Sequence, residues 1–119
     1  MEFASNSKKW EVHAYSGSPE KLIRSLLNNC ARHLPLDALG HLKAFMEFSG
    51  GSIFGSSTLT PPEITLRSDG SYSGGNMVLS VTLIFMDLKT EFLSNLLNKA
   101  LDEVCENMGC KFKEIMEVL

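Results

Sequence analysis

The chain has 119 residues, of which 44% are hydrophobic, which suits one compact domain spanning residues 1–119 and excludes an intrinsically disordered chain. The formal net charge of −3 at pH 7 gives no overall attraction to nucleic acid or to an anionic membrane, so neither is expected as a partner. Three cysteines, the lack of an apolar leader segment and the lack of a membrane-spanning run together predict a reduced, cytoplasmic protein.

The first part of the chain predicts a strand followed by a helix. Apolar and polar residues alternate over residues 9–15, which is the period of a half-buried strand. Ser18 is a suitable N-cap, Pro19 is a suitable first helical residue, and apolar side chains then recur at helical spacing as far as Cys30. Pro35 ends this helix. The outward face of the strand would carry Glu11, His13 and Tyr15.

The middle of the chain predicts a series of antiparallel strands. Gly40 marks the entry to the first of them, where a left-handed backbone is useful, and residues 41–48 then alternate strictly. A return strand over residues 53–59 and a shorter strand over residues 63–67 follow, and the composition of residues 68–76 predicts a flexible loop. The face of the first strand that points away from the core would carry His41, Lys43, Phe45 and Glu47.

The last part of the chain predicts a buried strand, a helix and a closing strand. Residues 77–88 are almost entirely apolar on both faces, which indicates a central strand. A helical stripe runs from Phe92 to Met108, Gly109 is a suitable stop, and residues 111–118 alternate as a strand. The order of elements predicts an α+β fold, namely a ferredoxin-like β-α-β-β-α-β sandwich with an inserted β-hairpin and two helices on one face of an antiparallel sheet.

The residues that could carry metal or nucleophilic chemistry do not form a standard motif. Zinc favours thiolate and imidazole ligands, but the spacings Cys30-x2-His33 and Cys105-x4-Cys110 are unusual, and the predicted fold places them at opposite ends of the sheet. No metal or cofactor is therefore predicted. A nucleophilic Cys30 would need His33 or His41 as its base. However, Cys30 lies near the C-terminal end of its predicted helix, and the negative end of the helix dipole raises the pKa of a thiol. No catalytic residue is assigned, and the sequence favours a protein that is not an enzyme.

The sheet face away from the helices is the most informative predicted surface. It mixes acids with bases and lacks the basic, aromatic signature of an RNA-binding sheet, and a semi-apolar uncovered face more often meets a second subunit. The preferred function is a non-catalytic module that forms a homodimer or larger homo-oligomer and binds a partner protein or a small ligand. The alternative is a small enzyme, or a metal- or cofactor-delivery factor, using His13, His41 and Lys43 on this face. The candidate ligand or interface residues are His13, Tyr15, His41, Lys43 and Phe45.

One stretch of the chain resembles part of a known family. The sequence LGHLKAF over residues 39–45, followed by a double-glycine hairpin and STLT, resembles the small accessory α+β domain associated with metallochaperone GTPases of the cobalamin-synthesis (CobW) type. The resemblance covers about a fifth of the chain, and the chain has no phosphate loop. It implies an accessory module with a role in metal or cofactor delivery, and it assigns no catalytic residue.

Overall fold

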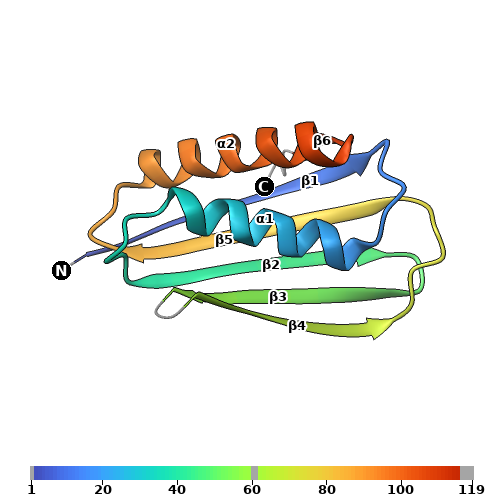
Figure 1. Ribbon diagram of the computed structural model, residues 1–119, viewed down its shortest axis with the longest axis horizontal. Coiled ribbons are helices and arrows are strands. Elements are labelled where there is room, and N and C mark those ends of the chain that lie inside the picture. The colour runs from blue at the N-terminus through green and yellow to red at the C-terminus, as the bar shows by residue number, and fades with distance from the viewer. Residues whose placement is uncertain (1, 60–61, 116–119) are drawn as a thin grey trace.

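The computed structural model describes residues 2–59 and 62–115. They form a six-stranded antiparallel sheet with two helices packed over one of its faces (Figure 1). This arrangement confirms the predicted α+β class and the position of both helices on the same face of the sheet. The elements are β1 (Phe3–His13), α1 (Pro19–His33), β2 (Gly40–Phe48), β3 (Gly51–Leu59), β4 (Pro62–Gly70), β5 (Met77–Met86), α2 (Thr90–Met108) and β6 (Lys111–Glu114).

The strands lie in the order β4-β3-β2-β5-β1-β6. The apolar strand β5 pairs along its length with both β1 and β2, which confirms its predicted central position. α1 connects β1 to β2, and these two strands run in the same direction with β5 between them. β3 and β4 extend the sheet outward from β2. α1 packs over β2, β3 and β4, and α2 packs over β1 and β6.

The first helix begins and packs as its sequence predicts. The hydroxyl of Ser18 accepts a hydrogen bond from the backbone N–H of Lys21 at 3.1 Å, and Pro19 occupies the first turn, where its missing N–H costs nothing. Leucines and an isoleucine at helical spacing then face the sheet, and each contributes about 1.5–3 kcal/mol by leaving water. The fully buried side chains on this face are Leu22, Ile23, Leu26, Leu27 and Cys30.

The core lies between the helices and one face of the sheet. Successive strand residues point to opposite faces, so every second residue of a strand reaches the core. β5 shows this most clearly, because five of its residues are at most 2% exposed while those between them are half-buried. The same alternation in the neighbouring strands defines a second, outward face. The buried β5 residues are Met77, Leu79, Val81, Leu83 and Phe85.

The structure gives Gly40 a different role from the predicted one. The prediction of a left-handed backbone is wrong, because Gly40 is not among the residues with positive φ. A Cβ atom at this position would instead overlap the carbonyl oxygen of Ile84 and lie 2.8 Å from the Cα of Phe85. Glycine is needed here because the backbone of β5 approaches the start of β2 very closely.

The alternation of residues 9–15 predicts Tyr15 on the outward face of the strand. This prediction is wrong. β1 ends at His13, and Ala14 takes a left-handed conformation with φ of 59°, so the alternation stops there. The ring of Tyr15 packs against the core, and its hydroxyl donates a hydrogen bond to the carbonyl oxygen of Ser18 at 2.8 Å. Tyr15 therefore helps to fix the turn that leads into α1.

The predicted loop over residues 68–76 is partly ordered. β4 continues to Gly70 and pairs with β3, so it is longer than predicted. The ring of Tyr72 meets that of Phe48 edge-on with centroids 5.2 Å apart, and its hydroxyl donates to the carbonyl oxygen of Gly75 at 2.9 Å. The closing strand is observed as β6, and the end of its predicted range lies outside the described residues.

Candidate functional site: the open face of the sheet

The face of the sheet opposite the helices, here called the open face, carries an aromatic pair near its centre. Phe45 of β2 lies directly opposite Phe54 of β3, and Ser80 and Arg67 continue the same row on β5 and β4. Phe54 is 40% exposed and Phe45 is half-buried. We call Phe45 and Phe54 the aromatic row. Two aromatic side chains on a solvent-facing sheet surface are typical of a protein contact site.

A second apolar group lies at one end of the open face. Phe3 of β1 pairs with Met86 of β5, and the backbone N–H of Met86 donates to the carbonyl oxygen of Leu39 at 2.8 Å. Phe3 and Leu39 are 64% and 60% exposed. We call Phe3, Met86 and Leu39 the end row. Large apolar side chains gathered in this way on an uncovered sheet are costly to leave in water.

The strip between the two apolar rows is polar apart from Ile84. The hydroxyls of Ser7 and Thr82 lie 3.0 Å apart, and Lys43 pairs with Thr82 from the other side. A shallow hollow of about 500 Å³ lies beside them, between β1, β5 and the end of β6. Its other lining residues include Lys9, Ser80 and Ile115. Glu114 also lines the hollow, so its surface carries both basic and acidic groups.

The structure brings together only part of the predicted site. His41, Lys43 and Phe45 project side by side from β2, as predicted. His13 lies at the other end of β1, where its Nε2 is 3.0 Å from a carboxylate oxygen of Glu11. His41 is level with Ser5 of β1, and eight strand residues separate that level from His13, or roughly 26 Å. His13 and His41 therefore cannot act on one small substrate.

The buried thiol of Cys30 is not arranged as a nucleophile. Burial raises the pKa of Cys30 to about 12, and the nearby Glu103 carboxylate adds to the rise. The imidazole of His33, which the sequence offered as a base, contacts Glu103 of α2 instead. A thiol that stays protonated and fully buried is inert toward electrophiles in solution. Cys30 therefore has the environment of a core side chain.

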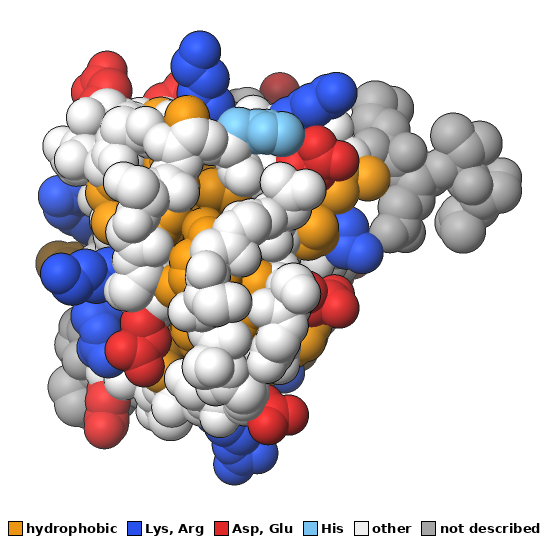
Figure 2. Space-filling view, turned by 90° about the vertical axis from the view of Figure 1, so that its right-hand side faces the viewer, with side chains coloured by type: hydrophobic (Ala, Val, Ile, Leu, Met, Phe, Trp, Pro, Cys, Tyr) orange, Lys and Arg blue, Asp and Glu red, His pale blue; other side chains and the backbone are white. Residues whose placement is uncertain are grey.

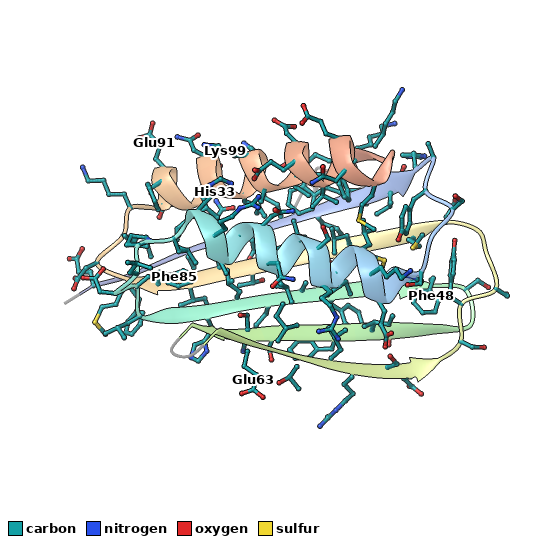
Figure 3. The ribbon with its side chains drawn as sticks, viewed as in Figure 1. His33, Phe48, Glu63, Phe85, Glu91 and Lys99 are labelled. Atoms are coloured by element: carbon teal, nitrogen blue, oxygen red, sulfur yellow. The ribbon has the colours of Figure 1, made fainter. Side chains whose placement is uncertain are left out.

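A polar network between the helices was not predicted from the sequence. A nitrogen of His33 contacts one carboxylate oxygen of Glu103, and the guanidinium of Arg32 donates to the other oxygen at 3.0 Å. Figure 3 shows His33 at the end of α1, where that helix meets α2. The partners lie 70 residues apart in the chain, so no local pattern could reveal them. The network joins the two helices above the core.

We expect Glu103→Gln to lower the free energy of unfolding at neutral pH. The variant should also lose less stability than the wild type as the pH is lowered. The hydrogen bond with His33 lowers the pKa of Glu103, burial opposes this, and the charges of His33, Arg32 and Lys99 lower it further. A lowered folded pKa stabilises the fold above the ordinary glutamate pKa, and that stability is lost as the pH falls through the folded value. Urea unfolding from pH 7 to pH 3 measures both effects. Glu106→Gln, at an exposed position of α2, is the control, and equal profiles for the two variants would contradict this account.

Two kinds of feature are absent from residues 2–59 and 62–115. No cluster of three or more histidine, cysteine, aspartate and glutamate side chains is arranged to hold a metal ion there. Over the same residues, neither helix has the length and apolar character needed to cross a membrane.

Comparison with known proteins adds little. No protein-family model matches the chain. No curated protein matches it either. Among solved structures, it is similar to the chain described as "Crystal structure of Zn(II)-bound YjiA GTPase from E. coli", with a TM-score of 0.44 and 12% sequence identity. The similarity covers 82% of this chain and 29% of that chain, so this chain spans less than a third of that protein. At this TM-score the likeness carries no argument about function.

Proposed function

We propose that the protein is a non-catalytic module that self-associates through the open face of its sheet, with a second copy of the chain as the occupant. The observation that carries the proposal is the pair of apolar rows on the face that no helix covers. Among the residues whose burial the structure describes, five large hydrophobic side chains are exposed, and three of them, Phe3, Leu39 and Phe54, lie on this one face. Covering them removes apolar surface from water, which is the main driving force of association.

The size of the open face suits an interface between two protein subunits. Five of the six strands in the sheet are nine to eleven residues long. With strands about 4.8 Å apart and about 3.3 Å per residue, the face covers roughly 700–900 Å². A stable dimer buries about 800 Å² on each partner. The open face is therefore large enough to support a stable dimer without help from the helix layer.

The charges on the open face also favour a protein partner of the same kind. Acidic and basic side chains are interspersed on this face. Two copies can therefore meet without bringing surfaces of like charge together. A polyanion such as nucleic acid would meet carboxylates at several positions. The charged residues of the strands on this face include Lys9, Glu11, Lys43, Glu47, Arg67 and Asp69.

We expect Phe45→Asp and Phe54→Asp each to convert the wild-type oligomer to monomer. Each change places a charge in the aromatic row, where pairing would bury it without a partner. Sedimentation velocity at several protein concentrations measures the change. Phe92→Asp is the matched control, because Phe92 is 41% exposed, close to the 40% of Phe54, but lies on α2. His41→Ala should also leave the assembly intact.

A wild-type protein that stays monomeric at every concentration would overturn this proposal. So would an oligomer that survives both aspartate variants and dissociates with Phe92→Asp. Native mass spectrometry of the same untreated samples tests the alternative function, because it reports a bound metal or small molecule. Loss of such a ligand in His41→Ala, with Phe45→Asp unaffected, would favour a delivery factor or an enzyme that uses His41 and Lys43.

Two finer assignments belong to this proposal. We assign the fold to the ferredoxin-like arrangement with β3 and β4 as the inserted hairpin, since the order of the other four strands, β2-β5-β1-β6, supports it. We also place the protein in the cytoplasm, because all three of its cysteines are free thiols, which suits a reducing compartment. Neither assignment depends on the oligomeric state.

A further inference from the structure

Two of the three cysteines meet at the end of α2. The helix stops at Gly109, which takes a left-handed conformation with φ of 68° and donates its backbone N–H to the carbonyl oxygen of Cys105 at 2.9 Å. In this type of helix ending, the residue after the glycine commonly touches the residue one turn before it. Those two positions are Cys110 and Cys105, and each thiol is close enough to affect the pKa of the other. The helix ending therefore places the two cysteines side by side.

The two thiols differ in their access to solvent. Cys105 is half-buried, whereas Cys110 is 3% exposed. Burial raises the pKa of both thiols, that of Cys110 to about 11, and the charge of Asp102 adds to the rise at Cys105. Figure 2 views the molecule from the end where α2 stops, and hydrophobic side chains show there between the backbone and other side chains. A reagent in solution can therefore reach one thiol of the pair before the other.

We infer that Cys105 and Cys110 form a reversible dithiol–disulfide pair, which in its oxidised form fastens the edge strand β6 to the end of α2. Cys110 directly precedes β6, a strand of four residues that pairs with β1 at the edge of the sheet. An edge strand this short has few hydrogen bonds to hold it. A covalent bond at Cys110 would restrain the strand at its first residue. This inference does not depend on self-association through the open face.

The oxidant for this reaction is a low-molecular-weight disulfide such as oxidised glutathione. The Cys105 thiol loses its proton and attacks one sulfur of the oxidant, which forms a mixed disulfide and releases one molecule of thiol. The Cys110 thiol then loses its proton and attacks the sulfur of Cys105, which forms the internal disulfide and releases the second molecule of thiol. The protein loses two hydrogens, and the oxidant is reduced to two thiols. The burial of Cys110 does not prevent the second step, because its target is an adjacent side chain.

The reaction is tested by incubating the native, full-length protein with excess oxidised glutathione and measuring its intact mass. The wild type should end two hydrogens lighter and carry no glutathione, and Cys30→Ser should behave in the same way. Cys110→Ala should keep one glutathione on Cys105, and Cys105→Ser should stay unmodified. A wild type that keeps glutathione, or that does not react while folded, would overturn the inference. Because Cys105 is half-buried, Cys105→Ser keeps the test usable if Cys110→Ala does not fold.

The effect on β6 is tested by hydrogen exchange followed by mass spectrometry. Peptides that cover residues 111–114 should exchange more slowly in the oxidised protein than in the reduced protein, and dithiothreitol should restore the faster rate. Peptides from β2 and β3, at the far side of the sheet, serve as the internal reference and should not change. Equal exchange of β6 in the two redox states would overturn the proposed fastening of the strand, even if the disulfide forms.

Discussion

Replacing Gly40 with valine is expected to destabilise the fold by about 3 kcal/mol or more, although valine is ordinarily the better strand residue. A side chain at Gly40 would meet the backbone of β5 at Ile84 and Phe85, and backbone atoms cannot rotate away as a side chain can. The strands would have to separate at the start of β2. Urea unfolding of both proteins at one concentration measures the loss. His41→Val, at the next residue but on the open face, is the control and should be close to neutral.

A second experiment separates the two kinds of contact at Gly40. The Cδ1 atom of the Phe85 ring also lies 2.5 Å from the position of the added Cβ. If the ring alone excluded a side chain, Phe85→Leu would relieve the clash, and the double variant would be more stable than the two single effects predict. We expect no such rescue, because the clash with the backbone at Ile84 remains. Substantial rescue would contradict the explanation based on the backbone.

Gly55→Val is expected to cost about 2–3 kcal/mol, through the contact between α1 and the sheet. A Cβ at Gly55 would lie 2.7 Å from Cγ2 of Ile23, 2.9 Å from Cδ2 of Leu66 and 3.1 Å from Cδ1 of Leu27. Valine adds two further methyl groups to a space that is closed on three sides. Thermal unfolding monitored by circular dichroism measures the change.

The neighbouring residue provides the matched control for Gly55. Ser56 lies on the same strand and points to the open face, where it is half-buried and has no helix above it. Ser56→Val therefore gains the strand preference of valine without meeting α1, and it should be neutral or slightly stabilising. If the two variants lost equal stability, the close packing of α1 on Gly55 would not be the cause.

The elements were predictable from the sequence where their signal is local. The alternation of residues 41–48, the apolar run of β5 and the helical stripes each repeat within a few residues, and the structure confirms all of them. Tyr15 was misplaced because the reversal at Ala14 leaves no trace in the alternation. The role of Gly40 is not visible locally because its need for glycine comes from Ile84 and Phe85 of β5, which follow it by more than forty residues. A local repeat of apolar residues does not report the backbone conformation of a single residue. It also does not report how closely two distant segments approach each other.

The candidate site was predictable only along single strands. Phe45, His41 and Lys43 were placed correctly relative to one another, because they share β2. Phe54 was not singled out, since its position opposite Phe45 depends on the register between two strands. The end row was missed for the same reason. The contact between Cys105 and Cys110 could have been predicted, because Gly109 marks the helix ending that brings those positions together.

The central position of β5 has a consequence for the entropy of the chain. The β2–β3 and β3–β4 pairings each join segments that are close in sequence, so they cost little conformational freedom. The β1–β5 pairing, from Phe3 opposite Met86 onward, instead encloses most of the chain between them. The middle of the sheet is thus held by the contacts that are most distant in sequence. Removing the last third of the chain would take away most of β5 and leave β2, β3 and β4 as a meander without the strand that pairs with β2. Removing the first strand would instead leave one edge of β5 unpaired.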